Sequence, residues 1–391
     1  MMTKNKLFVV LFFSLQIFVI LGAFGLGFII AERSSQSPSA SFPVLDEAFS
    51  LINKYGLREI TEDMRIEYGM IRGLVQAYGD PFTNHIEPAQ HELQTNQLTG
   101  SYGGIGSLIE MREDGHYYLL PYPNSPASNA GIQQHDRLFR VEGKLITDYA
   151  NLDEIIADIR GEVGTSVSIT VLRSPDYQME ETFSIKRAEV PLPSVLAYLD
   201  DDYPQVGVVK INIIAGTTSD ELTRAIESLQ DQGAERFLID LRNNGGGLLD
   251  SGISLAKLFL EKEQIIINQQ AKGEEIKTIR TNQNGKFREL PLIILVNENT
   301  ASAAEIFAGA LQANRRALLV GKNTYGKNTI QLVFDLQDQS SMHITNAKWW
   351  FSALPEFTEG SGLKPDVPFD EVDGMDPEVY RVAVEQLLAL P

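Results

Sequence analysis

Ser302 and Lys327 are the residues of this chain whose types and surroundings best suit covalent chemistry. Ser302 follows an apolar run that predicts a strand, and it precedes a run of small residues that predicts a helix. It is therefore expected at a strand-to-helix junction. A serine acts as a nucleophile only when a base takes its proton. No histidine lies near it in the sequence, so Lys327 rather than an imidazole is the candidate base.

Lysine can act as a base only when it is neutral, which requires its pKa to fall from about 10.4 towards roughly 7 to 8. Burial among apolar groups lowers the pKa of a lysine, and Tyr325 and Phe307 are expected to provide that burial. Gln331 could orient the amine without adding charge, whereas a carboxylate at that position would keep Lys327 protonated.

Each of these residues also has a simpler explanation. Ser302 could be the N-cap of a helix, which is the commonest use of serine at such a place. Lys327 taken alone could be a solvated surface residue. The combination favours chemistry, because the alanines on both sides of Ser302 leave room for a substrate backbone to approach.

A glycine-rich turn at residues 240–247 follows a second predicted buried strand. Consecutive glycines let backbone N–H groups face a ligand, and such groups can bind a phosphate or a developing oxyanion. The turn matches neither GxxxxGK[ST] nor GxGxxG, so nucleotide binding is not expected. Taken alone, such a turn is more often only a tight connection between a strand and a helix.

Composition narrows the function further. The chain has 391 residues and a net charge of −19, which argues against a nucleic-acid partner because phosphate binding requires clustered Lys and Arg. It has no cysteine, which excludes disulfides, thiol catalysis and Cys-based zinc sites. None of its five histidines forms HExxH or another pair with metal-ligand spacing. Neither a metal nor another cofactor is therefore expected.

The helices and strands predicted around these residues indicate a multidomain protein of α/β and α+β class. From residue 189 onward predicted strands and helices alternate, which is typical of an α/β core with ligand sites at the carboxyl ends of its strands. Residues 99–188 have short strands, glycine turns and one helix, as in a small separate module, and residues 43–98 have the apolar spacing of two helices. In the small module the strands are expected at residues 137–141 and 166–172 and the helix at residues 152–159.

Residues 1–42 are expected to form a cytosolic tip, a membrane anchor and a linker. Residues 7–30 are uncharged and would extend about 36 Å as a helix, enough to cross a hydrocarbon core of about 30 Å. Lys4 and Lys6 precede the run, which places the N-terminus inside the cell. The alternative is a cleaved signal peptide, whose apolar core is usually shorter. Both alternatives export the rest of the chain.

Seven blocks along the chain resemble, in the same order, the carboxy-terminal processing (tail-specific) proteases, which are serine peptidases of family S41. The resemblance extends over about residues 43–370. A serine motif alone would be weak evidence, whereas seven ordered blocks are strong. The blocks are residues 103–106; 125–127 with 130–132; 160–161 with 164–165; 240–244 with 246–247; 296–298 with 301–303 and 305–306; 326–327 with 331; and 362–366.

The resemblance implies hydrolysis by a Ser/Lys dyad in a ClpP/crotonase-like peptidase core at residues 189–391. By matching positions it implies Ser302 as nucleophile, Lys327 as general base and Gln331 as the third catalytic residue. It also implies an oxyanion hole formed by the amides of Gly246 and Ala303.

The resemblance further implies that residues 99–188 are a PDZ domain. An extended chain end would add as a strand beside residues 104–109, with its carboxylate held by glycine amides. The alternative is that these glycines only let strands approach each other. The implied peptide-binding residues are Gly103, Gly104, Ile105 and Gly106.

Three positions depart from the family pattern. Gly245 stands where the family usually has proline, and His135 precedes Asp136 where the family has Gly-Asp. Residues 352–355 replace a turn of the Thr-Pro-Ser-Gly type. These differences concern the module's loops and the shape of the substrate groove, and they leave the dyad intact.

Together these features predict a serine endopeptidase, anchored in a bacterial cell membrane by a single pass, with its catalytic part outside the cytoplasm. Its partners would be protein or peptide substrates with free C-termini, cut near those ends. The alternative is a catalytically inactive PDZ-containing scaffold on the same fold, against which the intact Ser302, Lys327 and Gln331 count. A small-ligand carrier has weak support from Trp349 and Trp350. Homo-oligomer formation stays open, as does whether the PDZ-like module activates or inhibits.

Overall fold

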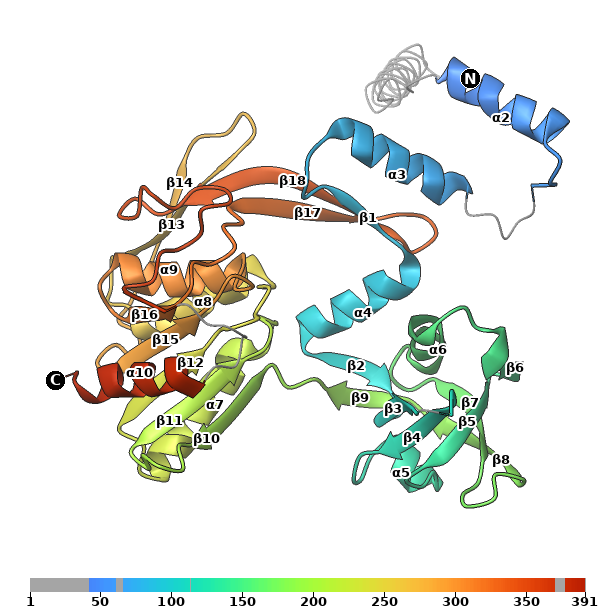
Figure 1. Cartoon of the computed structure of the whole chain (residues 1–391), viewed down its shortest axis with the longest axis horizontal. Helices are drawn as coiled ribbons and strands as arrows, with labels where there is room; N and C mark the ends of the chain where they lie inside the picture. The colour runs from blue at the N-terminus through green and yellow to red at the C-terminus, as the bar shows by residue number, and fades with distance from the viewer. Residues whose placement is uncertain (1–41, 61–65, 113, 370–376, 391) are drawn as a thin grey trace, which may run out of the picture. The chain divides into compact units, whose positions relative to one another are not determined.

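A computed structural model describes residues 42–60, 66–112, 114–369 and 377–390 (Figure 1). The predicted transmembrane segment at residues 7–30 lies outside these residues. Within the described ranges, no helix is both long enough and apolar enough to cross a membrane.

The chain divides into two compact units, residues 1–69 and 70–391. In the first unit the structure describes α2, Pro43–Tyr55, which begins with a proline and ends before Gly56 as the apolar spacing predicts. Helix α3, Ile66–Tyr78, begins in the first unit and continues into the second. The candidate site lies wholly in the second unit.

A six-stranded sheet forms the centre of the second unit. Its strands are parallel except for the antiparallel pair β10–β11. In spatial order they are β10 (Val195–Leu199), β11 (Val206–Ile211), β12 (Arg236–Asp240), β15 (Leu292–Val296), β16 (Leu318–Gly321) and β19 (Val367–Pro368).

Helices cover both faces of this sheet (Figure 1). One face packs on α7 (Thr218–Asp231), α8 (Leu249–Phe259) and α9 (Ala303–Ala313), and the other packs on α10 (Pro377–Leu388). Successive residues of a strand point to opposite faces. In β12, Phe237 and Ile239 therefore face the first group of helices while Leu238 faces α10. The mixed α/β class predicted for this region is confirmed.

A second sheet brings distant parts of the chain together. Its order is β1–β18–β13–β14, and β17 also pairs with β18. The short strand β1 thus lies beside β18, the partner of the strand that carries Gln331. The strands are β1 (Asn84–Ile86), β13 (Ile265–Ala271), β14 (Lys277–Arg280), β17 (Thr329–Asp335) and β18 (Ser341–Trp350).

A smaller β-rich module occupies the chain between α4 (Pro88–Thr99) and β10. Its sheet has the order β3–β4–β5–β7–β8, with β6 paired to β5, and it packs around its own apolar core. The predicted strands and helix are confirmed as β5, β7 and α6. The strands are β3 (Ser107–Met111), β4 (Tyr117–Pro121), β5 (Asp136–Val141), β6 (Lys144–Leu145), β7 (Ser166–Leu172) and β8 (Glu180–Lys186); the helices are α5 (Pro126–Ala130) and α6 (Leu152–Ile159).

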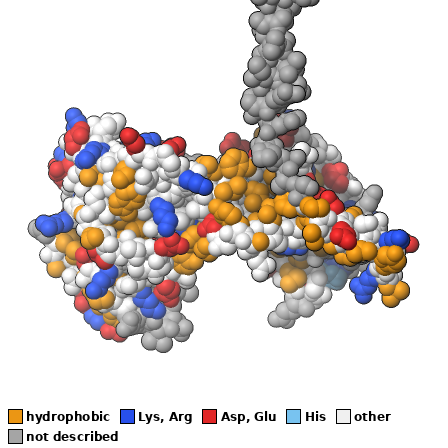
Figure 2. Space-filling model, turned by 90° about the horizontal axis from the view of Figure 1, so that it is seen from above, with side chains coloured by type: hydrophobic (Ala, Val, Ile, Leu, Met, Phe, Trp, Pro, Cys, Tyr) orange, Lys and Arg blue, Asp and Glu red, His pale blue; other side chains and the backbone are white. Residues whose placement is uncertain are grey.

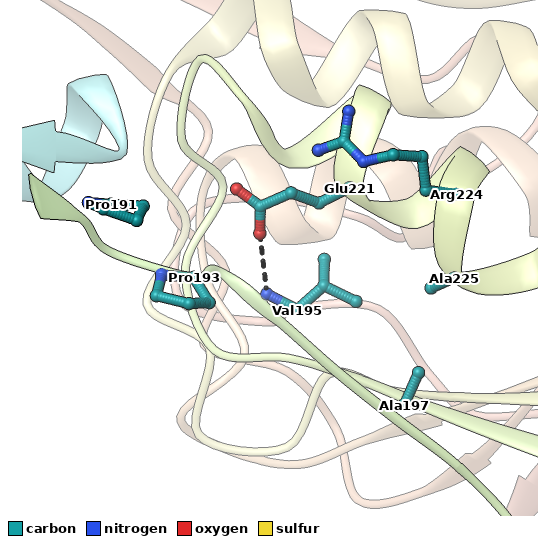
Figure 3. A pocket seen from close by; sticks show the side chains of 7 residues that line it. All are labelled: Pro191, Pro193, Val195, Ala197, Glu221, Arg224 and Ala225. Atoms are coloured by element: carbon teal, nitrogen blue, oxygen red, sulfur yellow. Dashed lines mark hydrogen bonds between the residues drawn. The ribbon is translucent and has the colours of Figure 1, made fainter. Parts of the chain in front are cut away.

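The chain enters and leaves this module through two strands that pair with each other, β2 (Ser101–Gly104) and β9 (Ala188–Pro191). The segment after β9 is held to α7 by Glu221, whose carboxylate accepts hydrogen bonds from the backbone N–H groups of Ser194 (2.7 Å) and Val195 (3.2 Å; Figure 3). The start of β10 is therefore held against α7.

Apolar side chains also remain exposed on parts of the surface (Figure 2). They include three successive residues of β17, Leu332, Val333 and Phe334, each 43–51% exposed. Because successive strand residues face opposite sides, both faces of the outer half of β17 meet solvent.

Candidate active site

Ser302 lies at the predicted strand-to-helix junction, in the connection from β15 to α9. It stands at the N-cap position of α9, which matches the simpler explanation of this residue. Its backbone is unusual, however, with φ 57° and ψ −120°. An N-cap residue normally has an extended backbone, and residues other than glycine avoid the conformation seen here. Capping alone therefore does not account for the geometry of Ser302.

A buried glutamate connects the Ser302 peptide to the Lys327 loop. Glu305 is fully buried, and its carboxylate accepts hydrogen bonds from the N–H of Ser302 (2.8 Å), the hydroxyl of Thr324 (2.5 Å), the N–H of Gly326 (2.7 Å) and the N–H of Lys327 (3.0 Å). Burial raises the pKa of Glu305, and the four hydrogen bonds act in the opposite direction. One side chain thus fixes both candidate catalytic residues through their backbones.

Sequence reasoning missed this role of Glu305, which it used only as part of a matching block. The available signal was a charged residue three positions after Ser302, in an otherwise small and apolar run. A glutamate at that position of a helix commonly hydrogen-bonds the N-cap backbone.

Lys327 is partly buried. Burial lowers the pKa of its amine, while the charges of Asp80 and Glu305 raise it. Its Nζ donates a hydrogen bond of 2.7 Å to Oε1 of Gln331. The group that receives this bond is a neutral amide, which does not by its own charge favour the ammonium form.

The apolar neighbours of Lys327 differ from those expected. Tyr325 is 52% exposed, and Phe307 is buried in the main core. The aromatic ring beside the amine belongs to Phe82, whose centre lies 5.3 Å from Nζ. Local sequence contains no signal for this contact, because Phe82 and Lys327 meet only through the pairing of β1 with β18 and of β18 with β17.

Ser302 and Lys327 are connected through Glu305, and among the hydrogen bonds of the described residues none joins Ser302 Oγ directly to Lys327 Nζ. Hydrogen bonds between a nucleophile and its base are often long or absent in structures without substrate.

The predicted oxyanion residues lie beside Ser302. A Cβ added to Gly246 would lie 2.8 Å from Ser302 Cβ and 2.9 Å from Ala303 N, so the glycine turn packs directly on the nucleophile's peptide. The N–H of Gly246 donates to Oδ1 of the buried Asn244 (2.9 Å). A substrate oxygen at this place would share or replace that bond. Ala303 is the first residue of α9, where a backbone N–H has no partner within the helix.

The predicted peptide-binding residues form the end of β2 and the loop to β3. Gly103 allows a close approach of chains, since a Cβ there would lie 2.0 Å from the carbonyl oxygen of Gly161. Gly104 pairs with Ala188 of β9. The carbonyl groups of Ile105 and Gly106 accept hydrogen bonds from the N–H groups of residues 127 (2.8 Å) and 122 (3.0 Å). Next to this loop, β3 pairs only with β4 among the described strands, so its other edge is open.

A separate surface hollow of about 310 Å³ lies between the segment before β10 and α7 (Figure 3). Its lining includes Pro191, Pro193, Glu221 and Arg224. It contains none of the residues that the sequence singles out for catalysis.

Comparison with known proteins places the chain in a known family. Residues 205–369, which include Ser302, Lys327 and Gln331, match the model of peptidase family S41. The carboxy-terminal processing protease CtpA of Bacillus subtilis (strain 168) is 32% identical over 339 residues, covering 87% of this chain and 71% of the relative. The carboxyl-terminal-processing protease of Synechocystis sp. is 35% identical over 361 residues, covering 88% of this chain and 83% of the relative. The solved structure of the photosystem II D1 C-terminal processing protease is 27% identical in sequence. The match covers 86% of this chain and 90% of that chain, with a TM-score of 0.46.

The fold class, the matched family and these relatives define a serine-type peptidase. The chain belongs to the carboxy-terminal processing proteases of family S41.

Proposed function

We propose that this C-terminal processing protease is a membrane-anchored endopeptidase that uses Ser302 as nucleophile and Lys327 as general base. The observation that carries the proposal is the setting of Lys327. Its side chain is partly buried, its amine is hydrogen-bonded to the neutral Gln331, and its backbone is fixed to that of Ser302 by Glu305. A lysine in such a place is biased towards the neutral form that can accept a proton.

In the proposed mechanism neutral Lys327 takes the proton of Ser302 as Oγ attacks the scissile carbonyl carbon. The amides of Ala303 and Gly246 stabilise the resulting oxyanion. The Lys327 ammonium then donates its proton to the leaving amine, and Gln331 accepts a hydrogen bond from Nζ in both protonation states. Neutral Lys327 next takes a proton from water as the water oxygen attacks the acyl carbon. It then gives that proton to Ser302 Oγ as the ester bond breaks, which releases the second product and restores the free enzyme.

The smaller module is proposed to bind substrate C-termini as a PDZ domain, with domain limits at residues 99–188 and the peptidase core at residues 189–391. The open edge of β3 supports this proposal, because an extended peptide can add to such an edge as a further strand. The loop at residues 103–106 precedes β3 and would hold the peptide's carboxylate. Residues 43–98 would form the helical segment that precedes the module.

Anchoring is proposed to depend on residues 7–30, with the catalytic part outside the cytoplasm. The support is the length of this uncharged run and the lysines before it. Protein isolated from its native membrane should begin at or very near Met1. An N-terminus near residue 32 would instead indicate a cleaved signal peptide.

The catalytic proposal is tested by incubating the full-length protein in detergent with an unfolded test protein and identifying the cut sites by mass spectrometry. Ser302→Ala and Lys327→Ala should each abolish cleavage while the far-UV circular dichroism spectrum stays unchanged. Full activity of Lys327→Ala would contradict the Ser/Lys mechanism. Equal, negligible cleavage by wild type and Ser302→Ala would favour the inactive scaffold.

A further inference from the structure

The turn at residues 80–83, between α3 and β1, meets the proposed base although it lies far from it in the sequence. The backbone carbonyl of Phe82 accepts a hydrogen bond of 2.5 Å from Nε2 of Gln331. The ring of the same residue lies beside Lys327 Nζ. The turn is held in place because β1 pairs with β18 and because the N–H of Thr345 donates to the hydroxyl of Thr83 (3.2 Å).

The Phe82 carbonyl determines which way the Gln331 amide faces. A carbonyl oxygen can only accept a hydrogen bond, and a side-chain amide has one accepting and one donating end. With Nε2 directed to Phe82, Oε1 is directed to Lys327 Nζ. The reversed amide would place an NH₂ group against the protonated lysine, where no hydrogen bond can form.

Asp80 shapes the turn that presents this carbonyl. Its carboxylate accepts hydrogen bonds from the N–H of Thr83 (2.9 Å), from the Thr83 hydroxyl and from the N–H of Phe82 (3.4 Å, long). Side chains of aspartate commonly stabilise turns in this way. Because the Phe82 peptide lies inside this turn, its orientation depends on Asp80.

We infer that Asp80 is a positioning residue of the peptidase site, acting on Lys327 through the Phe82 carbonyl and Gln331. This inference rests on the proposed role of Lys327 as base. It assigns to the segment before β1 a part in the site, which thus extends beyond the S41-matched residues 205–369.

A direct electrostatic effect accompanies this positioning. The charge of Asp80 raises the pKa of Lys327 against the larger lowering by burial. Asp80→Asn removes the charge and keeps an oxygen that can accept from the turn. The pKa of Lys327 should then fall, so that Lys327 loses its proton at a lower pH than in wild type.

The first test measures Lys327 itself. Wild type, Asp80→Asn and Asp114→Asn are acetylated with limiting acetic anhydride across a pH series, and the labelling of Lys327 is quantified by mass spectrometry. Asp114 is a matched control, because it accepts from the N–H of His116 (3.1 Å) and the hydroxyl of Tyr118 (2.6 Å) in a turn of the smaller module. Asp80→Asn should shift the midpoint to lower pH and Asp114→Asn should not. An unshifted midpoint in Asp80→Asn would exclude the direct charge effect, and the positioning through Phe82 and Gln331 is decided by the second test. Labelling requires no cleavage, so this result stands whether or not the peptidase proposal holds.

The second test is a double-mutant cycle on kcat/KM for peptide cleavage. Asp80→Ala should lower kcat/KM about tenfold in the wild-type background, as expected for one lost positioning hydrogen bond. In a Gln331→Ala background the same change should lower it less than about twofold, because the pathway to Lys327 is already broken. Equal losses in both backgrounds would show that Asp80 acts independently of Gln331 and would overturn the inference. If Asp80→Ala does not fold, Asp80→Leu replaces it in the cycle, because leucine is close to aspartate in shape and cannot accept the hydrogen bonds of the turn.

Discussion

Two ionisable side chains of opposite charge, the fully buried Glu305 and the partly buried Lys327, perform separate tasks in the site. The Glu305 carboxylate binds backbone and hydroxyl donors. The Lys327 amine binds a neutral amide. A carboxylate hydrogen-bonded to the amine would favour the ammonium form. The Glu305 carboxylate thus fixes the backbone of the Lys327 loop, while the neutral amide of Gln331 contacts Nζ, the atom proposed to accept the proton.

Glu305→Gln should impair both stability and catalysis. The carboxylate accepts four hydrogen bonds, whereas a glutamine can accept with one oxygen only and would direct an NH₂ group at donors. We expect a loss of about 2–4 kcal/mol in the free energy of unfolding, as for other buried networks with unsatisfied groups. The value of kcat should fall more than about tenfold while KM changes little. Urea unfolding and steady-state kinetics measure both.

A suitable control is Glu298→Gln, because Glu298 is 57% exposed and forms a surface ion pair with Lys322. It should change the free energy of unfolding by less than about 1 kcal/mol. Wild-type kcat in Glu305→Gln would exclude a role for Glu305 in positioning the dyad.

The pH dependence of cleavage should report the protonation of Lys327. The base acts when neutral, so kcat/KM should rise with pH, with a midpoint below the ordinary lysine pKa of 10.5 because burial lowers that pKa. Gln331→Glu places a carboxylate against Nζ and should move the midpoint to higher pH. Cleavage at neutral pH should then fall about tenfold for each pH unit by which the midpoint rises. A pH series of kcat/KM measures this change.

Leu332→Glu is the matched control for Gln331→Glu, since it adds the same charge at an exposed position of the same strand. Its midpoint should stay close to that of wild type. An equal rise of the midpoint in both variants would show that net charge, rather than contact with the amine, sets the pH dependence.

Among the elements, the connections at the carboxyl ends of β12 and β15 determine how closely the glycine turn approaches the nucleophile. The backbone carbonyl of Asn244 accepts a hydrogen bond from the N–H of Ala301 (3.0 Å). Its side-chain Nδ2 donates to the carbonyl of Ile211 (2.8 Å), and its Oδ1 accepts from the N–H of Gly246 (2.9 Å). Two neighbouring parallel strands thus deliver the two halves of the site to the same edge of the sheet, as expected for an α/β fold.

The neighbouring glycines Gly245 and Gly246 give a matched pair of variants. Gly246→Ala should severely reduce cleavage, because its Cβ would lie within 3 Å of Ser302 Cβ and of Ala303 N, and its φ of 98° is unfavourable for alanine. Gly245→Ala should behave like wild type, since a Cβ there meets no atom within 4 Å. Cleavage rates and melting temperatures compare the two. Similar activity in both variants would exclude a close fit of the turn to the nucleophile.

The sequence predicted the elements whose signals are local. The continuous apolar run of β15 and the small residues after it indicated the junction at Ser302, and period and turn signals indicated β5, β7 and α6. The turn at residues 80–83 carried a local signal only for the end of a helix, from Gly79, Asp80 and Pro81. Its part in the site depends on β1 pairing with β18, and pairing between distant strands is set by tertiary packing rather than by nearby residues. Sequence reasoning therefore gave this turn no part in the site.

At the scale of the whole molecule, the peptidase core and the smaller module are linked by short, hydrogen-bonded connections on both sides. The backbone of Gly216 donates to the carbonyl of Leu98 near the end of α4 (2.8 Å), and Glu221 fixes the segment that follows β9. Local sequence could indicate the module and the core separately, but not these contacts. In the proposed function, the smaller module binds the C-terminus of the substrate and the peptidase core cleaves the substrate chain.

Binding of the substrate C-terminus by the module, apart from cleavage by the core, predicts how a change at that C-terminus affects the kinetics. A peptide with an amidated C-terminus lacks the carboxylate that the glycine loop would bind, so it should lose ground-state binding without losing transition-state contacts at the dyad. We expect KM to rise about tenfold with kcat unchanged. The control peptide keeps its free C-terminus and carries an internal Glu→Gln change, which alters net charge by the same amount. It should be cut like the parent peptide. Equal KM values for the amidated and free-acid peptides would contradict carboxylate capture, and an equal effect of the internal change would attribute the difference to charge alone.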